Sequence, residues 1–245
     1  MKKIIALSFL AFQMAMAAVN AQDIKLDDVL NAYYKATGIA MMKDWTSIRV
    51  NGTTIEDGIE YPFTRIQKRP LKLREETDTQ GNKTISSFDG KQGWMVDPRF
   101  GTSAPEDMTA DQMKEMKEQA DMEGALYHWQ EKGHLAEFLG KDEMEGTSVY
   151  KIKITKASGN IETYFIDSES FILLKTSSKV KIDGNDLESD TFYSDYKEVS
   201  GVQIPNYVLN RQGENTASQI VIDNIEINPV ISDSLFEKPV VKIKP

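Results

Sequence analysis

The chain has 245 residues, no cysteine and a formal net charge of −9 at pH 7. The absence of cysteine excludes disulfides, thiolate chemistry and attachment of lipid to a cysteine of this chain. Such an acidic surface repels phosphate backbones and anionic headgroups, so neither nucleic acid nor tight membrane adhesion is expected, although acidity can also serve solubility alone.

The first 21 residues have the pattern of a secretory signal peptide. Lys2 and Lys3 precede an apolar run over residues 4–18, and Val19-Asn20-Ala21 has the small-x-small form that signal peptidases cut. We therefore expect export to the periplasm, cleavage after Ala21 and a mature chain of residues 22–245. No later stretch reaches the roughly 18 consecutive apolar residues that a spanning helix needs.

One amphipathic helix is predicted at the start of the mature chain, followed by strands. Leu26, Val29, Leu30, Tyr33 and Tyr34 recur at helical spacing over residues 26–36, and Gly38 is placed to end the helix. Residues 45–97 then predict strands at 47–50, 58–67, 71–76, 85–89 and 93–96, with turns at Asn51-Gly52, Asp57-Gly58, residues 80–82 and Asp89-Gly90.

Residues 105–140 change the period from two to near 3.6, which predicts a helical insert. Thr109-Ala110-Asp111-Gln112 has the form of a capping box, and Met113, Met116 and Ala120 form an apolar stripe after it. A second helical piece, interrupted or ended near Gly133 and Gly140, is expected to carry Leu126, Trp129, Leu135, Phe138 and Leu139.

Strands return from Thr147 to the C-terminal region. Tyr150, Ile152 and Ile154 alternate with lysines, which is typical of a strand with one wet and one buried face. The further strands are expected at 161–167, 171–182, 189–199, 202–211 and 219–227, with turns between them at residues 157–160, 183–186, 201 and 213–215. Together the strands predict one antiparallel sheet of about ten strands that curls or closes, in a single domain over residues 22–245.

Nothing in the sequence predicts catalysis, a metal or a cofactor. His128 and His134 are six residues apart, so they do not share a helix face as zinc ligands would. No glycine-rich phosphate loop and no G-x-S-x-G elbow occurs. Residues 183–186 are better explained by a hairpin turn than by a calcium loop, because Glu188 stands where that loop needs glycine.

Five short motifs resemble those of the LolA/LolB-like outer-membrane lipoprotein-sorting family. They are Lys68-Arg69-Pro70, the run from Asp89 to Pro98 with Trp94 inside it, and the segments 192–196, 201–205 and 232–239. The resemblance implies an α+β, β-dominated fold in which a curved antiparallel sheet forms an unclosed barrel around an apolar cavity with a helical lid.

The same resemblance implies a carrier and not an enzyme. The expected cargo is the acyl chains of lipoproteins or another lipid, carried by a monomer between an inner-membrane donor and an outer-membrane acceptor that it meets transiently. A periplasmic lipid-binding sensor or regulator on the same fold is the alternative, and an enzyme on this sheet would need polar groups that the sequence does not reveal. The longer, methionine-rich insert at residues 105–140 leaves the identity of the cargo open.

Arg69 matches the family arginine that reaches toward the lid and holds the empty cavity shut; alternatively, it only points into solvent before Pro70. Met108, Met113, Met116 and Met122 could line a cavity for chains of varied shape or only dock the insert onto the sheet. Trp94 could likewise contact ligand or belong to the core. The candidate ligand-binding residues are Arg69, Trp94, Met113, Met116, Leu126, Trp129, Phe138 and Leu139.

Overall fold

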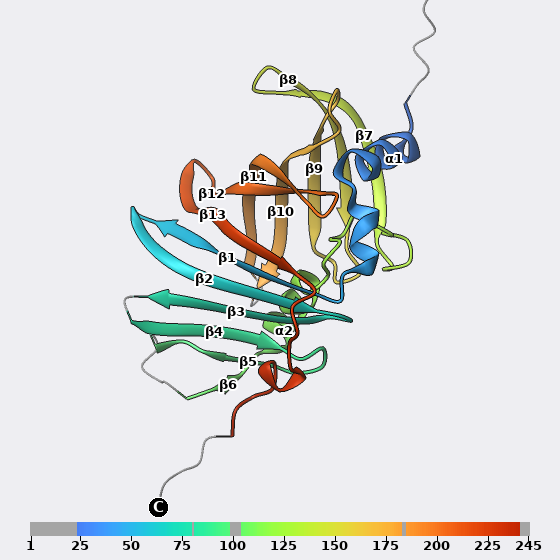
Figure 1. Cartoon of the computed structure of the whole chain (residues 1–245). Helices are drawn as coiled ribbons and strands as arrows, with labels where there is room; N and C mark the ends of the chain where they lie inside the picture. Colours follow the sequence, from blue (N-terminus) through green and yellow to red (C-terminus); the bar gives the residue numbers. More distant parts are fainter. Residues whose placement is uncertain (1–23, 80, 99–103, 183–184, 241–245) are drawn as a thin grey trace, which may run out of the picture.

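Thirteen antiparallel strands form one sheet in the computed structural model, which describes residues 24–79, 81–98, 104–182 and 185–240 (Figure 1). The expected signal peptide lies outside these residues. The strands are β1 Ser47–Glu56, β2 Ile59–Lys68, β3 Lys72–Thr79, β4 Asn82–Phe88, β5 Gly93–Val96, β6 Glu106–Asp107, β7 Leu135–Met144, β8 Thr147–Thr155, β9 Ile161–Asp167, β10 Leu173–Ile182, β11 Asn185–Val199, β12 Val202–Gln212 and β13 Asn215–Ile227.

The strand order is β6-β5-β4-β3-β2-β1-β13-β12-β11-β10-β9-β8-β7. Almost every strand therefore pairs with its neighbour in sequence, and the pairing of β1 with β13 joins the two runs of hairpins. A twisted sheet of this length must curl. Figure 1 shows the sheet curving around the helix α2, Ala110–Gln119, while β6 and β7 remain at opposite edges. The expected unclosed barrel is thus observed, with more strands than expected.

The N-terminal helix α1, Leu26–Thr37, agrees with the prediction, and Gly38 ends it with a left-handed φ of 67°. A short 3₁₀ helix, η1, follows at Ile39–Asp44. Val29 and Leu30 of α1 are buried against the strand residues Ile152 and Ile166. The amphipathic pattern therefore docks α1 onto β8 and β9.

The helical insert is only partly confirmed. α2 has the predicted capping box, in which Thr109 Oγ1 accepts a hydrogen bond from the Gln112 backbone N–H at 3.3 Å. The second helical piece is wrong, because residues after α2 form turns and β7 is an edge strand. The spacing that suggested a helix arises from two different faces: Phe138 packs inward, whereas Leu135 and Leu139 are exposed.

The predicted turn at Asn51-Gly52 is also wrong. β1 runs straight through these residues, and its register against β13 shifts between them, so the pair marks a β-bulge. A Cβ on Gly52 would lie 2.3 Å from the Val221 carbonyl oxygen, which explains why glycine is needed without a turn. The turn at Asp57-Gly58 is confirmed, whereas Asp183 and Gly184 lie outside the described residues.

The C-terminal segment covers the outer face of β2 to β5. Phe236 follows the 3₁₀ helix η3, Asp233–Leu235, and is fully buried. Its carbonyl oxygen accepts hydrogen bonds from Trp94 Nε1 at 2.8 Å and Ser87 Oγ at 3.0 Å. Because side chains alternate along strands, Trp94 and Ser87 face this segment while their neighbours face α2. The sheet is therefore covered on both sides here.

Candidate functional site

A largely apolar cavity of about 580 Å³ lies on the concave face of the sheet. Eight of the described strands contribute to its wall, and β1, β2, β3 and β13 do so through alternate residues, as the period of two requires. The apolar wall residues include Ile48 and Val50 of β1, Phe63 of β2, Leu173 of β10, Ile204 and Val208 of β12, and Ile220 and Ile222 of β13.

Helical segments and one loop cover this cavity. Tyr33 of α1, with Ile39 and Met42 of η1, lines one side, and Met122 and Ala125 of the loop after α2 line another. We call α1, η1 and residues 110–125 the lid. The cavity is therefore bounded by the curved sheet and the lid together.

Arg69 holds two parts of the lid to each other. Its Nε donates to the Trp45 carbonyl oxygen at 2.6 Å, and its Nη2 donates to the Met42 carbonyl oxygen at 2.8 Å. The guanidinium also forms an ion pair with Glu123, whose side chain is only 12% exposed. Burial alone would raise the pKa of Glu123, but hydrogen bonding and the charge of Arg69 outweigh it and lower that pKa. A side chain that joins η1 to the loop after α2 in this way can hold the lid closed.

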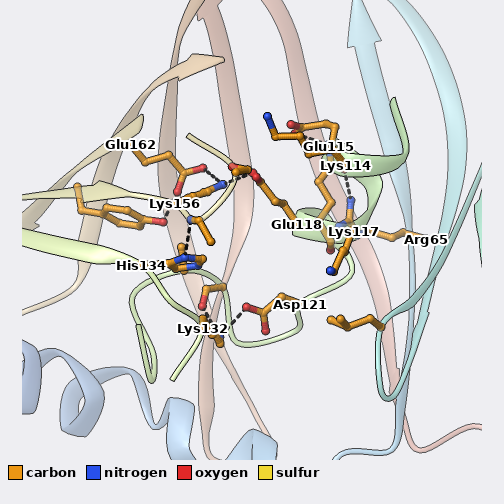
Figure 2. A pocket seen from close by; sticks show the side chains of 17 residues that line it. Arg65, Lys114, Glu115, Lys117, Glu118, Asp121, Lys132, His134, Lys156 and Glu162 are labelled. Atoms are coloured by element: carbon orange, nitrogen blue, oxygen red, sulfur yellow. Dashed lines mark hydrogen bonds and ion pairs between the residues drawn. The ribbon is translucent and has the colours of Figure 1, made fainter. Parts of the chain in front are cut away.

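A second pocket, of about 720 Å³, adjoins the apolar cavity and is lined mainly by charged side chains (Figure 2). The two spaces share Arg65, Gly124, Ala125 and Tyr164 as lining residues. Among the other lining residues of the second pocket are Lys114, Lys117, Asp121, Lys132 and His134. A ligand with an apolar and a polar end could therefore reach both spaces.

Ion pairs in the polar pocket tie α2 to the sheet. Lys156, at the end of β8, lies 2.9 Å from Glu118 of α2 and 2.6 Å from Glu162 of β9. Figure 2 shows these three side chains pointing toward one another. Burial would lower the pKa of Lys156, but Glu162 and Glu118 raise it overall. All three side chains are mostly buried, so the pairing is screened little by solvent.

The carboxyl end of α2 is held by polar groups of β2. Arg65 Nη2 donates to the Gln119 carbonyl oxygen at 2.8 Å, and Gln67 Nε2 donates to the same oxygen at 2.9 Å. The last carbonyls of a helix lack partners within the helix and carry partial negative charge, so a cation is favourable there. Sequence reasoning missed Arg65, although polar residues alternating on a half-buried strand were the available signal.

The predicted cavity residues mostly lie elsewhere among the described residues. Trp94 is buried under the C-terminal segment, and Leu139 is exposed. Met113 and Met116 pack with Leu73 and Phe88, so they dock α2 onto the sheet. None of the predicted residues is among those lining the apolar cavity; Leu126, Trp129 and Phe138 instead belong to or pack on the cluster around α1.

Of the four methionines considered for the cavity, Met122 lines it, whereas Met108, Met113 and Met116 belong to the contact between α2 and the sheet. The residues that do line the cavity are spread over the strands and the lid. Their shared location depends on the curvature of the sheet, which no local sequence pattern predicts.

No family sequence model matches the chain, and no curated protein sequence matches it either. Several solved structures share its architecture, the following three among them. A LolA superfamily protein from Nitrosomonas europaea matches over 88% of this chain and 98% of its own, with 12% identity and a TM-score of 0.59. A DUF1329 family protein from Desulfovibrio piger matches over 85% and 97%, with 13% identity and a TM-score of 0.58.

The third structure is a domain from Vibrio parahaemolyticus assigned to outer membrane lipoprotein sorting, which covers 85% of this chain and 96% of its own at 10% identity and a TM-score of 0.56. The chain has the LolA-like fold. At these identities the likeness concerns the LolA-like fold alone, so the site must be interpreted from its own residues.

The described residues contain no cluster of three or more histidines, cysteines, aspartates or glutamates that could hold a metal ion. None of the described helices is long and apolar enough to cross a membrane. The geometry that remains is a lidded apolar cavity beside a polar pocket, which suits binding of an amphipathic molecule.

Proposed function

We propose that the protein binds the acyl chains of lipoproteins in its apolar cavity and carries them through the periplasm toward the outer membrane. The single observation that carries this proposal is the cavity of about 580 Å³ between the sheet and the lid. Its volume lies within the roughly 300–1,000 Å³ typical of ligand pockets. The LolA-like fold is consistent with such a role.

Burial of hydrocarbon supplies the binding energy in this mechanism. Each CH₂ group removed from water contributes about 0.8 kcal/mol, so an apolar cavity can compete with a membrane for an acyl chain. Release then requires an acceptor with a better site. A lid that closes over the empty cavity also hides apolar surface that would promote aggregation.

Lipid retention and transfer test the proposal directly. We expect native mass spectrometry of the gently purified protein to detect bound lipid, and the emptied protein to bind a synthetic triacylated lipopeptide. It should also move that lipopeptide from donor to acceptor vesicles. Protein that takes up no lipopeptide would contradict the proposal, whereas uptake without transfer would favour the sensor alternative.

A matched pair of variants tests whether the ligand binds in the cavity. Ile220 lines the cavity, and Val221, next to it on β13, faces the opposite side of the sheet. Ile220→Glu should weaken lipopeptide binding by at least about tenfold because a carboxylate in an apolar site is costly. Val221→Glu should bind as the unmodified protein does. Equal effects of both variants would locate the binding elsewhere.

A further inference from the structure

Among the described residues, the hydroxyl group of Tyr33 has no hydrogen-bond partner, although it lies in a largely apolar cavity. Tyr33 lines the cavity and is only 8% exposed. In the part of the chain that the structure describes, no hydrogen bond to this hydroxyl is found, and no fully buried side-chain polar atom lacks a partner. The Tyr33 oxygen therefore keeps some accessible surface. The space available to it is the cavity, because the Tyr33 side chain lines that cavity.

Three other tyrosines near Tyr33 differ from it, because each has a hydrogen-bond partner. Tyr196 Oη donates to the Leu173 carbonyl oxygen at 2.7 Å, and Tyr193 Oη accepts a hydrogen bond from Thr176 Oγ1 at 3.3 Å. Tyr164 Oη donates to the carboxylate of Glu162. Among these four cavity tyrosines, only Tyr33 has a hydroxyl that makes no hydrogen bond to the described residues.

The Tyr33 hydroxyl is a hydrogen-bond donor at physiological pH. Burial, followed by the nearby Tyr193 and Tyr34 rings, raises the pKa of Tyr33 well above its ordinary value. A hydroxyl group that makes no hydrogen bond inside an apolar cavity is unfavourable. An acceptor on a bound molecule would remove this penalty, and a neutral donor suits a neutral acceptor such as a carbonyl oxygen.

Tyr33 lies beside the junction of the apolar cavity and the polar pocket. It belongs to the same buried cluster as Ala125 and Tyr164, and both of these residues line both spaces. An acyl ester has its carbonyl at the boundary between hydrocarbon and headgroup. The position of Tyr33 therefore matches the place where that carbonyl would lie if the chain filled the cavity.

We propose that the Tyr33 hydroxyl donates a hydrogen bond to the ester or amide carbonyl of an acyl chain bound in the cavity, with the rest of the amphipathic ligand directed toward the polar pocket. This inference rests on the proposed function, since it needs an acyl chain in the cavity. It adds that the protein recognises the linkage of the chain and distinguishes acyl from alkyl lipids.

Two glycerol lipids that differ only at this linkage test the inference. The probes are 1-palmitoylglycerol, which has an ester carbonyl, and 1-O-hexadecylglycerol, which has an ether oxygen instead. We expect the unmodified protein to bind the ester about threefold to tenfold more tightly, as one hydrogen bond allows. Tyr33→Phe should bind both lipids equally, at the affinity of the ether.

Tyr207→Phe is the matched control because the Tyr207 hydroxyl already donates to Gln219 Oε1 at 3.0 Å and Tyr207 is not among the residues that line the cavity. This variant should keep the preference for the ester, and urea unfolding of both variants checks that they fold. An unmodified protein that binds both lipids equally, or a preference that survives in Tyr33→Phe, would overturn the inference while leaving acyl-chain binding intact. Failure to bind either lipid would contradict the proposed function itself.

Discussion

At the scale of single residues, Arg69 joins parts of the chain that lie far apart in sequence. It contacts carbonyls at the end of η1 and the carboxylate of Glu123 in the loop after α2. Charge-assisted hydrogen bonds of this kind are stronger than neutral ones. The side chain of Arg69 is about one-third exposed, so solvent reduces the gain without removing it.

We predict that Arg69→Leu keeps the fold but opens the lid more often. The substitution removes the Arg69 donors to the Met42 and Trp45 carbonyls and to the buried Glu123 carboxylate, and leaves the Met42 carbonyl with only the Trp45 N–H, at a cost of about 1–2 kcal/mol in local opening. Amide hydrogen exchange should therefore speed up about fivefold to thirtyfold over residues 39–45 and 119–125. Release of bound lipopeptide should speed up as well.

Arg49→Leu controls for the loss of an arginine. Among the described residues Arg49 forms an ion pair with Glu226 alone, at 2.9 Å, and both side chains are substantially exposed. Such surface pairs contribute about 0.2–1 kcal/mol. Exchange in the lid should be unchanged in this control. Unchanged lid exchange and unchanged release in Arg69→Leu would refute the latch role.

At the scale of elements, the lid is attached by carboxylates whose ionisation matters. Burial alone would raise the pKa of Glu118, but hydrogen bonds and the charge of Lys156 outweigh it and lower that pKa, as Arg69 does for Glu123. A carboxyl group whose pKa is lowered by folding stabilises the protein above its unfolded pKa, and this stabilisation is lost as the pH falls through the folded pKa.

We predict that Glu118→Gln with Glu123→Gln destabilises the protein at pH 7 and that this difference shrinks below about pH 4.5, the ordinary pKa of glutamate. Urea unfolding of both proteins from pH 7 to pH 3.5 measures it. Asp121, whose pKa is raised mainly by burial, is present in both proteins. Its opposite contribution to the pH dependence of stability therefore cancels to first order in the comparison. A difference that stays constant to pH 3.5 would contradict the prediction.

Gly38 shows how an element end can be specified by one residue. Its left-handed φ of 67° ends α1, and a Cβ there would lie 2.0 Å from the Gly201 carbonyl oxygen. Gly146 also has a positive φ, of 82°, but no atom lies within 4 Å of the Cβ position. Substitutions at the two glycines therefore distinguish the cost of backbone strain from the cost of a clash with a packed neighbour.

We predict that Gly38→Ala lowers the free energy of unfolding by about 3 kcal/mol or more, and Gly146→Ala by only about 1 kcal/mol. The backbone strain is common to both substitutions, whereas the clash with Gly201 occurs only in the first. Urea unfolding of the two variants measures the difference. Equal losses would show that α1 shifts away from Gly201 at little cost.

Elements with a strong local pattern could be predicted from the sequence, and elements defined by long-range packing could not. β5 and β9 have the predicted bounds because their strands are flanked by turn residues. Leu135, Phe138 and Leu139 have an apolar spacing close to that of a helix, but they lie in the edge strand β7, which exposes the two leucines while Phe138 packs inward. Arg69 could be predicted from a motif, whereas Tyr33 and Ile220 line the same cavity only because the sheet curves.

At the scale of the whole molecule, the C-terminal segment joins the end of the chain to the outer face of the first hairpins. Ile231 and Phe236 pack with Ile66 of β2, and Lys68 donates to the Ile231 carbonyl oxygen at 2.7 Å. Asp233 also forms ion pairs with Lys68 and Lys72. The segment therefore adds a second long-range connection to the pairing between β1 and β13.

We predict that Phe236→Ala lowers the free energy of unfolding by about 3–5 kcal/mol, because it leaves a cavity where a fully buried ring packs against β2. Val230→Ala is the control in the same segment, since Val230 is fully exposed and should change stability by less than about 0.5 kcal/mol. Urea unfolding measures both variants.

If the C-terminal segment and the whole sheet form one cooperative unit, the Phe236→Ala transition should move to lower urea with an unchanged slope, since the surface exposed on unfolding stays the same. A loss below about 1 kcal/mol would mean that the segment detaches without affecting the sheet. A second transition at low urea would mean that β2 to β5 unfold separately from β7 to β13. The cavity wall would then depend on the β1–β13 pairing alone.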